Sequence, residues 1–161
     1  MSLTIGKLKI KSANFNGVSS LPPLAKMINV QQLRKSDLAE DAGFYFGYGF
    51  LSSVFPYLMQ DQYDRDNSIK EYTSITLENK YIKAVILPEF GGRVWSLYDK
   101  ERGRDIVYEN PIVRPCNIAL RNAWLAGGIE YNCGMVGHSP FTCDKLFAAT
   151  TKLDDGTPVL R

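Results

Sequence analysis

Hydrophobic and polar residues alternate in short runs along the chain, and a period of two is typical of β-strands. The first run extends from Leu3 to Ile10 and has three candidate inward-facing positions: Ile5, Leu8 and Ile10. After Gly91-Gly92, the run RVWSLYDK repeats the pattern and predicts two faces, with Val94, Ser96 and Tyr98 on one and Trp95, Leu97 and Asp99 on the other. No helix of normal length is evident in this pattern.

Turn residues separate several of these runs. Tyr72 to Leu77 and Tyr81 to Leu87 flank Glu78-Asn79-Lys80, and Asn79 suits a tight turn, so a hairpin is predicted. Asp154-Asp155-Gly156 predicts a second hairpin near the C-terminus. Consecutive strands joined by short turns indicate an all-β fold, an antiparallel β-sandwich with little helix.

An aromatic stripe at two-residue spacing precedes these strands: Phe44, Phe46, Tyr48 and Phe50. Such stripes usually fill interiors, which favours a core strand over a ligand platform. We expect residues 1–161 to be a single β domain, with N-terminal strands and loops in 1–70 and the motif-bearing strands in 71–161. Because the last predicted strand would leave an unpaired edge, we expect a larger domain or a partner to cover it.

Composition excludes several classes of function. The 161 residues are 45% hydrophobic and carry a formal charge of +2, with the basic residues scattered. This distribution predicts no nucleic-acid or membrane partner. The N-terminus MSLTIGKLKIKS has no apolar signal-peptide core, so a cytoplasmic location is expected.

The chain contains three cysteines and one histidine, whose spacing does not match a zinc site. We therefore expect no metal and, without a phosphate loop or nucleotide fingerprint, no cofactor. The cysteines, Cys116, Cys133 and Cys143, are interpreted as reduced structural thiols. A catalytic pair of Cys133 with His138 is a weaker alternative, because closeness in sequence does not prove contact.

The segment RNAWLAGGIEYNCGMVGHSPF, from Arg121 to Phe141, concentrates the candidate chemistry. It combines aromatic rings, a carboxylate, amides, an arginine and the single histidine with glycines that allow close backbone approach to a ligand. Directional hydrogen-bonding groups beside flat apolar faces suit a polyhydroxylated ligand such as a sugar. A turn-rich junction between strands is the structural alternative.

Two runs carry a family resemblance: LPEFGGRVWSLYDKERGRDIVYENP and NAWLAGGIEYNCGMVGHSPF. Together they resemble the galactose-mutarotase-like superfamily, and they are most similar to the uncharacterised mutarotase-like domain found ahead of tetratricopeptide-repeat arrays in bacterial proteins. The resemblance implies a large β-supersandwich of which this chain is the N-terminal half. In active relatives, a glutamate and a histidine act as base and acid on a sugar, and these residues normally lie in later strands.

The resemblance also implies which residues lie near a sugar. Glu130 and His138 are the candidate catalytic residues. Five residues are candidates for substrate binding: Arg93, Arg121, Asn122, Trp124 and Asn132. Each also has a structural interpretation: Arg93 can pair with a carboxylate at a strand end, Trp124 can belong to the core, and His138 can be a satisfied structural residue. Arg121 can instead recognise a carboxylate or phosphate on an acidic sugar.

Three functions follow as hypotheses. The first is a carbohydrate-binding domain of a sugar-processing protein. The second is aldose 1-epimerase or glycoside hydrolase activity in the full-length protein. The third is a non-enzymatic assembly module that forms a homo-oligomer through exposed sheet edges.

Overall fold

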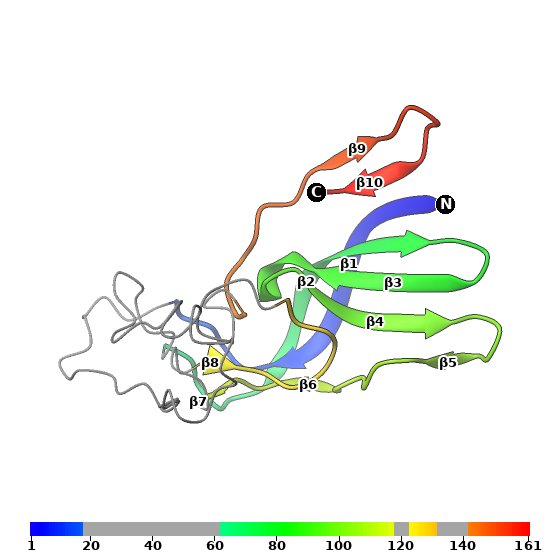
Figure 1. The fold of residues 1–161 in the computed structure, drawn as a ribbon. Coiled ribbons are helices and arrows are strands. Elements are labelled where there is room, and N and C mark those ends of the chain that lie inside the picture. The colour runs from blue at the N-terminus through cyan, green and yellow to red at the C-terminus, as the bar shows by residue number, and fades with distance from the viewer. Residues whose placement is uncertain (18–61, 118–122, 132–141) are drawn as a thin grey trace, which may run out of the picture.

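The computed structural model describes residues 1–17, 62–117, 123–131 and 142–161, which form β-strands and turns (Figure 1). Six strands make one sheet in the order β5-β4-β3-β2-β1-β6. Their bounds are β1 (Ser2–Ser12), β2 (Ser68–Glu78), β3 (Ile82–Leu87), β4 (Arg93–Asp99), β5 (Arg104–Asp105) and β6 (Ile112–Val113). The described ranges hold no α-helix, and among them no helix is long and apolar enough to cross a membrane. The predicted all-β fold is confirmed.

The sheet is antiparallel except at one end, where β6 pairs parallel to β1. Two of the predicted inward positions of β1 are confirmed, because Ile10 is buried and Leu8 packs against the same cluster. The prediction for Ile5 is wrong, since its side chain is 64% exposed. Ile5 is three positions from Leu8, so the alternation of the strand turns it to the other face.

Both predicted hairpins are confirmed. In the β2–β3 hairpin, the side-chain Oδ1 of Asn79 accepts hydrogen bonds from the backbone N–H groups of Tyr81 and Ile82, each at 2.8 Å. Asparagine favours such turns because its side chain substitutes for a backbone acceptor. The C-terminal hairpin joins β9 (Thr150–Lys152) to β10 (Pro158–Leu160). Gly156 in its turn has a φ of 81°, which glycine adopts readily.

A β-bulge in β4 changes which residues share a face. The pairing with β3 shifts from Val85↔Ser96 to Ile86↔Val94, which leaves Trp95 as the extra residue. Trp95 therefore packs in one hydrophobic cluster, whereas Val94 and Leu97 pack in another. The predicted alternation, with Trp95 and Leu97 on one face, is wrong because it assumes a regular strand.

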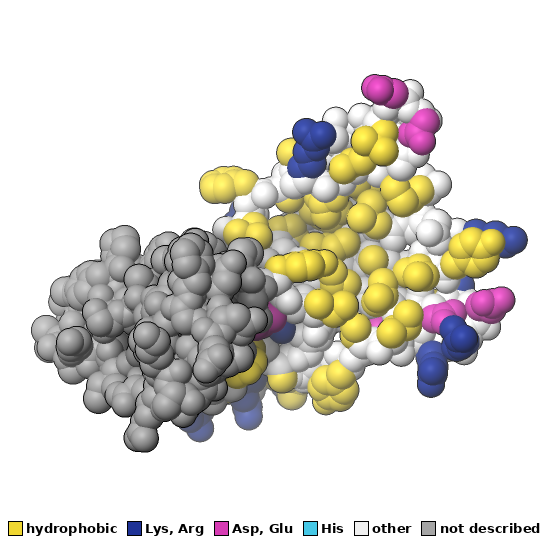
Figure 2. Space-filling model, in the orientation of Figure 1, with side chains coloured by type: hydrophobic (Ala, Val, Ile, Leu, Met, Phe, Trp, Pro, Cys, Tyr) yellow, Lys and Arg dark blue, Asp and Glu magenta, His cyan; other side chains and the backbone are white. Residues whose placement is uncertain are grey.

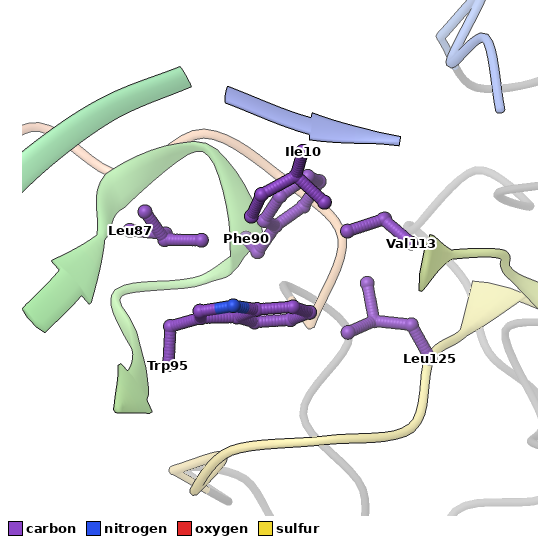
Figure 3. Close-up of a cluster of buried hydrophobic side chains, with 6 residues drawn as sticks. All are labelled: Ile10, Leu87, Phe90, Trp95, Val113 and Leu125. Atoms are coloured by element: carbon purple, nitrogen blue, oxygen red, sulfur yellow. The ribbon is translucent and has the colours of Figure 1, made fainter. Parts of the chain in front are cut away.

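The main hydrophobic cluster covers one face of the sheet (Figure 3). Phe90, from the 3-10 helix η3 (Pro88–Phe90), lies at its centre, with its ring centroid 4.6 Å from that of Tyr72 and 6.4 Å from that of Trp95. Leu125 is 2% exposed and joins the cluster from outside the sheet. The members of the cluster are Ile10, Leu87, Phe90, Trp95, Val113 and Leu125. Leu125 thereby fixes residues 123–131, the described part of the glycine-rich motif and called the motif-bearing segment below, against the sheet.

The opposite face of the sheet is also apolar, but it is only partly covered. Leu160 of β10 packs there against the buried residues Ile75, Ile86 and Val94. Figure 2 shows hydrophobic side chains spread over this face beside the C-terminal hairpin. They line a groove of about 410 Å³. The lining residues are Leu77, Ala84, Ile86, Gly92, Val94, Leu97, Ile129, Tyr131 and Leu160.

Asp105 of β5 links β4 to the residues that follow β5. Its carboxylate accepts hydrogen bonds from the Ser96 hydroxyl and, at 3.0 Å each, from the backbone N–H groups of Leu97 and Val107. Burial by itself raises the pKa of Asp105, but these hydrogen bonds outweigh it, and the net pKa is below the ordinary value. The folded state therefore binds this proton more weakly than the unfolded state does.

This difference makes the stability dependent on pH. A depressed folded pKa contributes stability above the unfolded value of about 4, and this contribution is lost as the pH falls through the folded pKa. The free energy of unfolding should therefore fall when the pH is lowered from neutral to about 3, and we expect this fall to be smaller in Asp105→Asn than in the unchanged protein. Urea denaturation of the unchanged protein and the variant at several pH values measures the two falls. Parallel pH profiles for the two proteins would refute this role for Asp105.

Candidate functional site

A pocket of about 480 Å³ lies where the motif-bearing segment meets the first residue of β4. Its wall includes the short strands β7 (Cys116–Asn117) and β8 (Ala123–Trp124), which pair antiparallel. The lining residues are Arg93, Arg114, Cys116, Trp124, Leu125, Ala126, Gly127, Gly128 and Glu130. The described part of the lining therefore combines an indole, two guanidinium groups, a carboxylate and a thiol.

A buried ion pair forms the floor of this site. Arg93 is 3% exposed, and its Nη2 lies 2.9 Å from Oε2 of Glu130, whose side chain is 15% exposed. The other terminal nitrogen, Nη1, donates to the carbonyl oxygens of Leu125 at 3.2 Å and Gly127 at 2.7 Å. Arg93 thus holds three points of the motif-bearing segment against β4. The sequence left two interpretations of Arg93 open, an ion pair with a carboxylate and a position in the pocket. In the structure, Arg93 both pairs with Glu130 and lines the pocket.

The electrostatics of this pair follow from its burial. Burial lowers the pKa of Arg93, and the nearby charge of Glu130 opposes that effect. Thr142 supports the pair from a third segment, with its hydroxyl donating to Oε2 of Glu130 at 3.1 Å. Nothing in the sequence pattern indicated Thr142, because it lies outside the glycine-rich motif and its contact is set by the tertiary fold.

The glycines before Glu130 allow the segment to approach β4 very closely. Gly127 and Gly128 have φ values of 101° and 67°. A Cβ on Gly128 would lie 2.4 Å from the carbonyl oxygen of Val94, and Ile129 exchanges backbone hydrogen bonds with Val94 at 2.8 and 3.1 Å. The sequence predicted that these glycines allow a ligand to approach the backbone closely. In the structure, the close neighbour of Gly128 is the backbone of Val94 in β4.

Trp124 supplies the aromatic surface of the pocket. It is half-buried at the end of β8, directly before the buried Leu125. A tryptophan is large, rigid and partly apolar, so a half-buried indole in a pocket offers a flat contact surface. Among the described residues, Trp124 belongs to neither buried cluster on the sheet, and it lines the pocket.

The structure thus brings together three of the predicted site residues: Arg93, Trp124 and Glu130. The other four, Arg121, Asn122, Asn132 and His138, lie outside the described residues, as do Cys133 and the aromatic stripe. Arg114 and Cys116 also line the pocket, although the sequence did not single them out as ligand contacts. Across the described ranges, no group of three His, Cys, Asp or Glu side chains is arranged to hold a metal.

Comparison with known proteins gives one family match and one structural match. The model of a family described as a domain of unknown function (DUF5107) matches residues 50–159. The fold is similar to that of a TPR-domain containing protein from Parabacteroides distasonis ATCC 8503, with a TM-score of 0.64 and 21% sequence identity. The match covers 96% of this chain and 22% of that protein. At this identity the likeness shows the shared fold.

Proposed function

The chain belongs to the DUF5107 family, and we propose that it is a carbohydrate-binding, mutarotase-like domain. One observation carries this proposal: Arg93, Trp124 and Glu130 line the same pocket. The pocket volume of about 480 Å³ falls in the range of about 300–1,000 Å³ typical of small-molecule sites. The resemblance of both sequence runs to the galactose-mutarotase-like superfamily supports the same conclusion.

Each polar and aromatic group has a defined task in this proposal. The indole of Trp124 packs against the C–H face of a sugar ring. Glu130 lines the pocket and is held by Arg93 and Thr142 at its Oε2, and we expect its carboxylate, an acceptor-only group, to accept hydrogen bonds from sugar hydroxyls. Arg93 is deeply buried and both of its terminal nitrogens already donate within the protein, so its proposed task is to hold Glu130 in place.

Calorimetric titration of the chain with a panel of hexoses tests the proposal. We expect a member of the panel to bind with millimolar or tighter affinity. Trp124→Ala should weaken binding about tenfold, the effect of losing about 1.4 kcal/mol of ring contact. Phe147→Ala is the matched control, because Phe147 is fully exposed and lies outside the pocket lining. A panel without any binder, or equal losses in the two variants, would contradict the proposal.

A further inference from the structure

We propose that the pocket takes a sugar bearing a carboxylate, and that Arg114 binds this charge. The inference rests on the proposed function and deepens it by naming the substrate class. Its starting point is the balance of charge among the described lining residues, which include two arginines, Arg93 and Arg114, and one carboxylate, Glu130. Arg93 is paired with Glu130 at 2.9 Å, so among the described lining residues the remaining positive charge is that of Arg114.

Within the described residues, Arg114 has no side-chain partner that would compete with a ligand. In the part of the chain that the structure describes, it is exposed and makes no ion pair or side-chain hydrogen bond. A ligand can therefore engage its guanidinium without breaking an existing contact. A guanidinium presents two parallel N–H donors that match the two oxygens of a carboxylate.

The backbone around Arg114 is held in place by its neighbours. Val113 is completely buried, Pro115 is buried, and Arg114 and Cys116 alternate with them as exposed residues. A residue before proline is restricted to extended conformations, which limits the directions open to Arg114. Arg114 and Cys116 both line the pocket, so this short segment presents a cation and a thiol to the same space.

The charge balance favours a carboxylate over a phosphate. One unpaired guanidinium matches the single negative charge of a uronate. A phosphate monoester carries nearly two negative charges at neutral pH, one more than a single guanidinium neutralises. The inferred ligand class is therefore a uronic acid or a chain that contains one.

Calorimetry with glucuronate, glucose and glucose 6-phosphate tests this inference on the full chain. We expect glucuronate to bind about five- to tenfold more tightly than glucose at low salt, and this preference to shrink as salt screens the charge. Arg114→Gln should abolish the preference. Arg104→Gln is the matched control, since Arg104 is exposed, lies on β5 and is outside the pocket lining, and it should retain the preference.

The possible results distinguish a failure of carbohydrate binding from a failure of the carboxylate assignment. Binding of glucose and glucuronate with equal affinity would overturn the carboxylate assignment and leave carbohydrate binding intact. Tighter binding of glucose 6-phosphate than of glucuronate would overturn the assignment in favour of a phosphate. A failure of all three sugars, with no other hexose binding either, would overturn the proposed function and this inference with it.

Cys116 gives a second readout that needs no affinity measurement. It is exposed beside Arg114 in the lining, whereas burial raises the pKa of Cys143 to about 12 and slows its reaction. We expect glucuronate to protect Cys116 from iodoacetamide, followed by mass spectrometry of its peptide, more than glucose does at equal concentration. Equal protection by the two sugars, or none by either, would count against Arg114 as the carboxylate contact.

Discussion

Replacing Arg93 with methionine is expected to lower the free energy of unfolding by about 3–5 kcal/mol. The substitution leaves Glu130, whose side chain is 15% exposed, without its cationic partner at 2.9 Å. It also removes the donors to the carbonyl oxygens of Leu125 and Gly127. The cost of an uncompensated buried charge is much larger than the net gain of a typical ion pair, so the loss is large. Urea denaturation monitored by circular dichroism measures it.

Two control variants make this prediction specific. Lys9→Met breaks an ion pair with Glu71 in which the side chains are 70% and 54% exposed, and it should leave stability nearly unchanged. Replacing both Arg93 and Glu130 with methionine should recover part of the loss, because no buried charge then remains unpaired. If Arg93→Met were as mild as Lys9→Met, the ion pair would not be what holds the pocket together.

The second large effect is expected for Gly128→Ala, at about 2–5 kcal/mol. The φ of 67° is strained for any residue with a side chain, and the added Cβ would lie 2.4 Å from the carbonyl oxygen of Val94. Relief requires moving the backbone that bonds Ile129 to Val94 at 2.8 and 3.1 Å. Glu130 follows two residues later, so sugar binding should fall together with stability.

Gly156→Ala is the matched control for this substitution. Gly156 has a similar φ of 81°, but a Cβ there meets nothing within 4 Å. Its expected cost is therefore only the conformational strain, about 1–2 kcal/mol. Thermal unfolding of the two variants separates the effect of backbone strain from that of the steric clash. Equal losses of stability in the two variants would show that the close approach of Gly128 to β4 is unimportant.

The accuracy of the sequence-based prediction depended on the range of the interactions involved. The β2–β3 hairpin was predictable because Asn79 sets the turn through hydrogen bonds to residues two and three positions away. The bulge at Trp95 was not, because the register of β4 depends on its pairing with β3. A local pattern of alternation carries no information about such a shift.

The same distinction applies to the site. Trp124 and Glu130 were identified because they stand out in a glycine-rich motif, and the pocket does contain them. Arg114 and Thr142 were missed, because their relation to Glu130 arises only when distant segments pack together. The role of Gly128 was predicted in kind, as a close approach, but its partner is Val94 rather than a ligand.

Binding of a sugar against Trp124 can be tested directly, because the chain contains a second tryptophan that serves as an internal control. The chain has two tryptophans; Trp95 is 3% exposed in the core, whereas Trp124 lines the pocket. Their indole N–H signals in a ¹H–¹⁵N spectrum, assigned with Trp124→Phe, should respond differently to titration with neutral and acidic hexoses. We expect a saturable shift of the Trp124 signal with little change at Trp95. An unmoved Trp124 signal, or equal shifts at both indoles, would contradict it.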